Sequence, residues 1–315
     1  MNTKYKTIDL FAGIGGIRKG FEETGAFETV YANDFEPNCK KTYDLNHEGT
    51  RLTIANIRDV SPSSLPSYDF LLGGFPCQAF SIAGYRHGFN DIKGRGNLFY
   101  DIARIIKETN PQGFLLENVK NLKGHDGGKT FTIITNVLTE LKYHVTYKVL
   151  NSMEYGNIPQ NRERIYIVGF KDKTHFDKFE FPSPIPLTRT TSELLENEVD
   201  EKYYYDDKPL GLKLKEYDIV KGKIYQWRRI YVRENKKGVC PTLTANMGQG
   251  GHNVPIIRDD KGIRKLTPLE CARFMGFSDI RFPPDLSDSK LYMQIGNSVV
   301  VPVIKRVAEQ ILKAL

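Results

Sequence analysis

The chain has 315 residues, of which 40% are hydrophobic, 26% charged and 11% aromatic. These fractions are typical of a globular protein with a sizeable core, so they exclude wholesale disorder, and the length allows one large domain or two smaller ones. No run approaches the roughly 20 apolar residues that cross a bilayer, and the N-terminal segment lacks the apolar core of a secretory signal. We therefore expect a protein of the cytosol with no membrane partner.

Charge and cysteine content narrow the class further. Lys and Arg number 45 against 38 Asp and Glu, which gives a formal net charge of +7. Such an excess suits a polyanionic partner, although solubility alone also explains it. The four cysteines are far apart in the sequence, so neither a disulfide framework nor a metal site is predicted.

Short β-rich runs alternate with helical patterns through the first part of the chain. Strands are predicted over residues 5–10, 28–32, 51–55, 69–73, 113–116, 143–149 and 165–169. Apolar residues at helical spacing occupy 16–24, 36–46, 97–109 and 129–141. Strands separated by helices predict right-handed βαβ units. The expected fold class is therefore α/β, with a doubly wound, mostly parallel sheet.

The alternation stops at residues 181–188, where three prolines interrupt any regular element. We expect a first domain over 1–182 and a second, smaller domain over 183–284. The segment 285–315 contains an amphipathic pattern at 299–314, which we expect to pack back on the first domain and complete it. Residues 208–237 carry ten Lys or Arg against three acidic residues, interleaved with four aromatic residues. This pattern suits contacts with phosphates and bases, and a solvated surface is the alternative.

A glycine-rich sequence, FAGIGG at residues 11–16, lies between the first predicted strand and the first helix. Glycines there allow a tight turn and close approach of a ligand, and the start of a helix favours negative charge. Asp34 ends the second strand, where a carboxylate accepts hydrogen bonds from ribose hydroxyls, and Phe35 beside it can stack on adenine. One alternative is that the glycine-rich sequence forms a purely structural turn that binds no ligand. A dinucleotide is another, although the glycine spacing differs from the dinucleotide fingerprint.

Three further motifs fall near strand ends. Cys77, within GGFPCQAFS at 73–81, follows the fourth strand and is a candidate nucleophile, although a lone cysteine is usually a small buried hydrophobe. Glu117 ends the next strand and can serve as a proton donor, or instead cap a helix or form an ion pair. Arg162 and Arg164 precede the last strand of the first domain and can hold an anion or a base carbonyl, unless Glu163 pairs with one of them.

Taken together, these motifs are similar to the ordered motifs of the C5-cytosine DNA methyltransferases, specifically the bacterial modification enzymes. The resemblance rests on DLFAGIGG, GGFPCQAFS, ENV, QNRER, RKLTPLECARFMGF at 264–277 and QIGNSVVVPV at 294–303. It covers nearly the whole chain except roughly residues 183–262. It implies a Rossmann-like methyltransferase fold with S-adenosylmethionine as cofactor, double-stranded DNA as substrate and a small target-recognition domain.

Roles follow from the resemblance position by position. Cys77 matches the nucleophile, Glu117 the acid at the cytosine N3 edge, Arg164 a clamp on O2, and Arg162 a second arginine of that pocket. The implied cofactor contacts are Phe11, Ala12, Gly13, Ile14, Gly15, Gly16, Asp34, Phe35, Asn56, Ile57, Gly74, Pro76, Leu98 and Asn297. Asn56 departs from the usual Asp, but its amide oxygen can still accept a hydrogen bond.

The DNA contacts are less defined by the motifs. We expect them at Ser81, Gln226, Arg229 and Thr242, with Gln226 and Arg229 as candidates for contacts in the groove. The resemblance further implies a flipped cytosine, a covalent Cys77 adduct and a bacterial enzyme that modifies the site of a cognate restriction endonuclease without a stable complex between them. We expect a monomer, because one flipped base needs one active site. The alternatives are an RNA C5-methyltransferase, a catalytically silent DNA-binding regulator and a nicotinamide dehydrogenase.

Overall fold

The computed structural model describes residues 4–76, 98–205, 208–228, 230–249 and 254–315. The chain divides into two compact units. Unit 1 comprises residues 1–150, 163–183 and 303–315, and unit 2 comprises 151–162 and 184–302. Within the described part of the chain, no helix has the length and apolar character needed to span a bilayer.

Unit 1 is built on a seven-stranded sheet with the order β3-β2-β1-β4-β5-β8-β6. The strands are β1 (Tyr5–Leu10), β2 (Phe27–Asp34), β3 (Leu52–Ile54), β4 (Phe70–Gly74), β5 (Gly113–Val119), β6 (His144–Asn151) and β8 (Glu163–Phe170). The first five are parallel, and β8 runs antiparallel to β5. The doubly wound, mostly parallel α/β prediction is confirmed, and each expected strand is present within a few residues.

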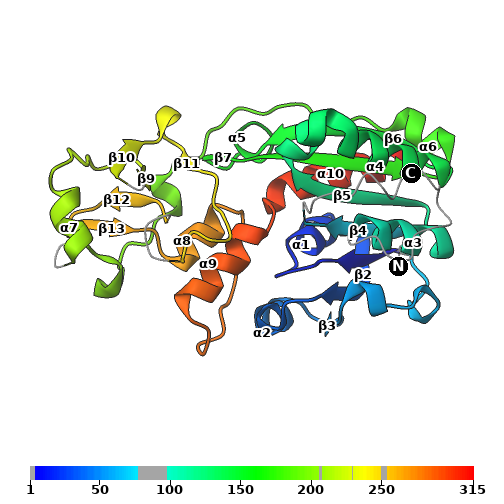
Figure 1. The fold of residues 1–315 in the computed structure, drawn as a ribbon, viewed down its shortest axis with the longest axis horizontal. Helices are drawn as coiled ribbons and strands as arrows, with labels where there is room; N and C mark the ends of the chain where they lie inside the picture. The colour runs from blue at the N-terminus through cyan, green and yellow to red at the C-terminus, as the bar shows by residue number, and fades with distance from the viewer. Residues whose placement is uncertain (1–3, 77–97, 206–207, 229, 250–253) are drawn as a thin grey trace. The chain divides into compact units, whose positions relative to one another are not determined.

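Helices connect these strands (Figure 1). They are α1 (Gly16–Glu22), α2 (Pro37–Asn46), α3 (Phe99–Thr109), α4 (Lys129–Glu140) and α6 (Lys173–Lys178), with 3-10 turns η1 (Ile57–Asp59), η2 (Pro62–Ser64) and η5 (Lys120–Gly128). Period-two alternation sends Ile8 and Leu10 of β1 into one apolar cluster with α3 and α4. Thr7 and Asp9 therefore lie on the opposite face, and both are fully buried.

The helix α10 (Val301–Ala314) returns the chain to unit 1 (red in Figure 1). Its buried side chains recur at helical spacing, which is why the sequence pattern predicts it. A Cβ added to Gly20 of α1 would lie 2.5 Å from Ile304 of α10, so the glycine permits close packing of the two helices.

Unit 2 contains a four-stranded antiparallel sheet in the order β10-β9-β12-β13. These strands are β9 (Tyr225–Arg228), β10 (Tyr231–Glu234), β12 (Ile256–Arg258) and β13 (Ile263–Lys265), and β7 (Gln160–Asn161) pairs separately with β11 (Cys240–Pro241). Its helices are α5 (Ser152–Tyr155), α7 (Pro209–Leu214), α8 (Pro268–Arg273) and α9 (Asp288–Asn297), with 3-10 turns η6 (Ser192–Leu194), η7 (Glu201–Tyr203) and η8 (Lys236–Gly238). Buried aromatic and aliphatic residues, including Trp227 and Ile256, form its core.

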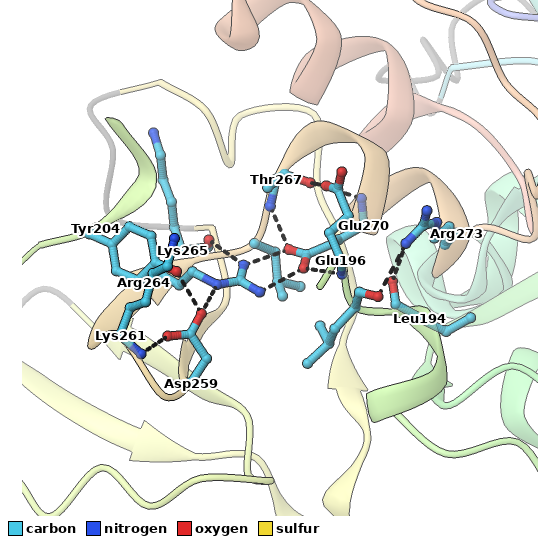
Figure 2. Close-up of polar contacts among 12 residues, drawn as sticks. Leu194, Glu196, Tyr204, Asp259, Lys261, Arg264, Lys265, Thr267, Glu270 and Arg273 are labelled. Carbon is cyan, nitrogen blue, oxygen red and sulfur yellow. Dashed lines mark hydrogen bonds and ion pairs between the residues drawn. The ribbon is translucent and has the colours of Figure 1, made fainter. Parts of the chain in front are cut away.

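A buried ionic cluster ties several segments of unit 2 together, as Figure 2 shows. Arg264 is fully buried, and both terminal nitrogens of its guanidinium lie 2.8 Å from the Glu270 carboxylate. Its Nε lies 2.6 Å from Asp259. Glu270 also accepts the N–H groups of Thr267 and Glu196. The 264–277 motif thus forms an internal anchor of this unit.

The observed units differ from the expected domains in two segments. Residues 151–162 and 285–302 belong to unit 2, whereas residues 303–315 belong to unit 1. The physical reason is hydrogen bonding. Arg162 donates to the carbonyls of Leu243, Gly296 and Ser298, which joins these segments within unit 2.

Candidate active site

The glycine-rich turn lies at the carboxyl end of β1, in the centre of the parallel sheet. Phe11, Gly13 and Gly15 all have positive φ, at 56°, 56° and 81°, and this sharp path leads directly into α1. The carboxylate of Asp34 accepts the N–H of Gly13 at 2.7 Å. A Cβ added to Gly13 would meet no atom of the described residues within 4 Å, so among these residues this part of the turn faces open space.

The other residues expected to contact a cofactor in unit 1 follow neighbouring strand ends. The ring of Phe35 is 72% exposed, which is unusual for a large apolar side chain. Asn56 follows β3, and its side-chain oxygen accepts the N–H of Arg58, while Ile57 is buried. Leu98 begins α3 and packs on the apolar cluster of the sheet. Burial raises the pKa of the Asp34 carboxyl above its ordinary value, although hydrogen bonds from backbone N–H groups act in the opposite direction.

Glu117 and Arg164 form an ion pair at the ends of adjacent strands. The Arg164 Nε lies 3.1 Å from Glu117 Oε1, and both side chains are largely buried. The antiparallel register brings β8 alongside β5 at this point. The ion-pair alternative for Glu117 is therefore part of the structure, and the pair also holds the carboxylate in a defined orientation.

The segment leading to Cys77 is fixed against the same strand. Asn118 donates from Nδ2 to the carbonyl of Phe75 at 2.8 Å. A Cβ added to Gly74 would lie 3.5 Å from both Glu117 Oε2 and Ile17 of α1. Gly74 therefore lies between the glutamate and the helix that follows the glycine-rich turn. Pro76 is exposed.

Two expected residues of this motif, Cys77 and Ser81, lie outside the described residues. The other three cysteines, Cys39, Cys240 and Cys271, are buried. Burial raises the pKa of the Cys240 and Cys271 thiols, which makes them poor nucleophiles at neutral pH.

Arg162 is 3% exposed, and its guanidinium is held by three main-chain carbonyls of unit 2, at 2.7, 3.2 and 2.6 Å. The alternative that Glu163 pairs with a neighbouring arginine side chain is wrong. Both Glu163 carboxylate oxygens lie 2.9 Å from Lys120 instead. The sequence could not show this, because Lys120 is distant along the chain and follows a different strand.

The DNA-contact candidates described in the structure all belong to unit 2. Gln226 is in β9, and its cross-strand partner is Arg233. Thr242 donates to the carbonyl of Asn161 at 2.6 Å. Arg229 lies outside the described residues. Asn297, expected at the cofactor, is exposed at the end of α9 in unit 2.

Sequence reasoning missed two buried residues near the glycine-rich turn. The imidazole of His47 lies 3.1 Å from the carbonyl oxygen of Ile14. Asp9 is buried just before the turn, and its carboxylate oxygens have no hydrogen-bond partner among the described atoms. The available signal was the polar residue Asp9 in a strand otherwise rich in apolar residues, and a histidine directly after α2.

The arrangement combines a backbone turn with an acidic strand end, an exposed aromatic ring and a buried carboxylate–guanidinium pair. The model for C-5 cytosine-specific DNA methylases matches residues 5–313. The chain belongs to this family.

Known relatives are similar to this protein in sequence over almost all of its length. The type II methyltransferase M.Bsp6I of Bacillus sp. (strain RFL6) is 52% identical, over 97% of this chain and 98% of that protein. M.SsoII of Shigella sonnei is 43% identical, over 100% of this chain and 82% of that protein. The protein is therefore a DNA cytosine-C5 methyltransferase.

A solved structure agrees on the fold. A DNMT2 mutant of Spodoptera frugiperda has a TM-score of 0.77 and 22% identity, and the match covers 98% of this chain and 100% of that chain. At this identity the likeness shows the fold alone.

Proposed function

We propose that this methyltransferase acts on one cytosine of a short duplex DNA sequence, as the modification component of a restriction-modification system, with S-adenosylmethionine as its cofactor. The observation that carries the proposal is the Glu117–Arg164 pair beside the segment that leads to Cys77. Names of type II methyltransferases among the relatives support the biological role.

The described residues of unit 1 fit the cofactor. Phe35 offers an exposed ring for adenine, and the Asp34 carboxylate, which accepts the N–H groups of Gly13 and Glu36 on different oxygens, offers acceptors for a ribose hydroxyl. The open space at Gly13 leaves room for a ligand against the backbone. Ala12, Ile14, Gly16, Asn56, Ile57, Gly74, Pro76, Leu98 and Asn297 remain predicted contacts. When bound, the cofactor supplies an electrophilic methyl group.

Side chains of the protein activate the cytosine for methyl transfer. Carbon C5 of cytosine is a weak nucleophile, so the ring must first be converted to an enamine. Cys77 as a thiolate adds to C6, and Glu117 delivers a proton to N3 as electron density moves onto the ring. Arg164 orients the Glu117 carboxylate and would contact the base oxygen O2. After methylation, loss of the C5 proton and departure of the Cys77 sulfur restore the aromatic ring.

Unit 2 is the proposed target-recognition part, the role that the sequence predicts for residues 183–284, and unit 1 is the proposed catalytic part. The target base must leave the helix stack to reach the pocket, at a cost of a few kcal/mol. Gln226, Arg229, Thr242 and Ser81 are the proposed DNA contacts. Arg162 would support the pocket through the three carbonyls that it holds.

We further propose that the enzyme works as a monomer in the bacterial cytosol. One flipped base requires one active site, so a second subunit is not needed for the chemistry. A cognate endonuclease would recognise the same DNA site without forming a stable complex with this protein.

The deciding experiment is transfer of labelled methyl from S-adenosylmethionine to duplex DNA of mixed sequence, followed by base analysis. We expect label in 5-methylcytosine with the wild type and none with Cys77→Ser. Cys271→Ala, at a buried cysteine of unit 2, is the matched control and should retain activity. Label in tRNA in preference to DNA, or undiminished label with Cys77→Ser, would contradict the proposal.

A further inference from the structure

Helix α2 connects two contacts on the glycine-rich turn. Asp34 ends β2, two residues before the N-cap of this helix at Glu36, and accepts the N–H of Gly13 at 2.7 Å. His47 ends the helix, and its Nε2 lies 3.1 Å from the carbonyl oxygen of Ile14. The residues that flank α2 on its two sides therefore hold two consecutive residues of the turn, Gly13 and Ile14.

The imidazole of His47 is itself held in place. It is 6% exposed and packs on Tyr43, one helical turn earlier, with ring centroids 4.5 Å apart. The hydroxyl of Tyr43 accepts a hydrogen bond from Arg18 at 3.0 Å. Arg18 also donates to the carbonyls of Glu48 and Thr50, at 2.7 and 2.8 Å, directly after His47. These contacts leave the ring little freedom to turn away.

Gly15 allows the ring to approach the turn. A Cβ at this position would lie 2.1 Å from His47 Nε2, a separation that atoms cannot adopt. The φ of Gly15, 81°, also disfavours any residue with a side chain. The glycine therefore serves the internal contact with His47, and its role is not limited to approach of a ligand.

The protonation state of His47 follows from its partner. A carbonyl oxygen can only accept, so Nε2 carries the hydrogen. Burial, together with the positive charges of Arg18 and Lys19, lowers the pKa of His47 to about 4, although the hydrogen bond to Ile14 and the charge of Glu22 oppose this. The ring is therefore neutral at neutral pH, with the tautomer that donates to Ile14.

We propose that His47 is a positioning residue that fixes the glycine-rich turn in the conformation that binds S-adenosylmethionine. This inference rests on the proposed cofactor site. A turn that is already ordered loses little conformational freedom when the ligand binds. The free energy of binding is therefore more favourable than for a turn that must first become ordered. The expected effect of losing the contact is weaker cofactor binding with unchanged chemistry at saturation.

The test compares His47→Met with His47→Gln, two unbranched side chains of similar length. Only Gln retains a nitrogen donor near the position of Nε2. We expect His47→Met to raise the Kd for S-adenosylmethionine, measured by calorimetry, by about three- to tenfold, the range that one hydrogen bond supplies. We expect His47→Gln to remain within about twofold of wild type, and kcat at saturating cofactor to change little in either variant. Amide hydrogen exchange without cofactor should be faster at residues 13–16 in His47→Met alone.

The outcomes separate this inference from the proposed function. If wild type binds no S-adenosylmethionine, the cofactor proposal itself fails. If wild type binds and His47→Met binds equally well, with unchanged exchange at the turn, the positioning role is wrong and the cofactor proposal stands. If His47→Met lowers thermal stability, His47→Phe is the variant to test instead, because it keeps a ring against Tyr43 and removes the hydrogen-bond donor. It should show the same loss of affinity.

Discussion

At the residue scale, Glu117 combines two features that proton donors need. The residue is 7% exposed, and Arg164 fixes the orientation of its carboxylate. Gln has nearly the same shape but cannot deliver a proton. We expect Glu117→Gln to lower kcat by about 10²- to 10⁴-fold, the usual contribution of general acid catalysis, with the Kd for cofactor unchanged. Single-turnover methyl transfer and calorimetry measure the two quantities, and an unchanged kcat would remove Glu117 from the chemistry.

Asp9 gives unit 1 a pH-dependent stability. Burial raises the pKa of its carboxyl to about 8, against 3.8 in the unfolded chain, and the charge of Arg18 opposes this only in part. The folded state therefore keeps a proton that the unfolded chain releases. The stability from this group is fully present below about pH 3.8 and is lost as the pH rises toward about 8.

We therefore expect Asp9→Asn, which resembles the protonated form, to melt at a higher temperature than wild type at pH 8. The difference should reach the order of a few kcal/mol in free energy of unfolding and shrink as the pH falls to 5. Melting curves across this range are the measurement. Asp177→Asn, at an exposed surface pair, is the control. A difference between Asp9→Asn and wild type that does not vary with pH would contradict the prediction.

At the element scale, the β9–β10 hairpin presents an open polar face. The cross-strand pairs Arg228–Tyr231 and Gln226–Arg233 share this face, whereas Tyr225 and Trp227 point into the core of unit 2. No ion pair involves Arg228 or Arg233 among the residues described here. Ile230, at the turn, is 83% exposed. Basic and aromatic side chains on an open face suit contact with DNA.

We expect Arg228→Ala to weaken duplex binding by about 1–3 kcal/mol if the arginine reads a base, with relaxed discrimination among sequences. A contact to phosphate would instead weaken all sequences alike and lower the salt slope by about one. Fluorescence anisotropy at several salt concentrations distinguishes these results. Lys173→Ala, whose lysine pairs with Asp177 in unit 1, is the control and should bind like wild type. Unaltered binding by Arg228→Ala would exclude this face.

The ionic cluster around Arg264 joins β13 to α8 and to Glu196, which lies 74 residues before Glu270 in the sequence (Figure 2). Arg264→Met fills similar volume but leaves the fully buried Glu270 carboxylate without its counter-charge. Removal of one partner of a buried pair typically costs about 3–5 kcal/mol of stability. We expect that loss in chemical denaturation. The double variant Arg264→Met with Glu270→Gln should recover part of the lost stability. If the double variant is no more stable than Arg264→Met alone, the two charges are uncoupled.

At the scale of the whole molecule, the sequence predicted the positions of the strands and helices better than it predicted which of them lie side by side. Alternating strands and helices are encoded locally, so the parallel sheet of unit 1 could be predicted. The antiparallel direction of β8 could not, because direction depends on which strand it joins. Thr7 and Asp9 are polar residues of β1, yet both are fully buried on the face of the sheet opposite the α3–α4 cluster.

The same limit applies to the candidate site. Glu117 and Arg164 were expected from their motifs, and the register of β5 and β8 explains their contact. The partners of Arg162 lie 81 to 136 residues away in the sequence, so no local pattern reveals them. His47 was missed for the same reason, since its partner is a backbone carbonyl with no side-chain signature.

The return of α10 to unit 1 has a consequence for protein synthesis. The ribosome makes α1 at the start and α10 only after the residues of unit 2, yet Gly20 and Ile304 pack together in the finished fold. A nascent chain therefore exposes the face of α1 that α10 later covers, and contacts between such distant residues form slowly. Unit 1 gains this contact only after translation has passed residue 304, so we expect a chain that ends before α10 to fold less stably.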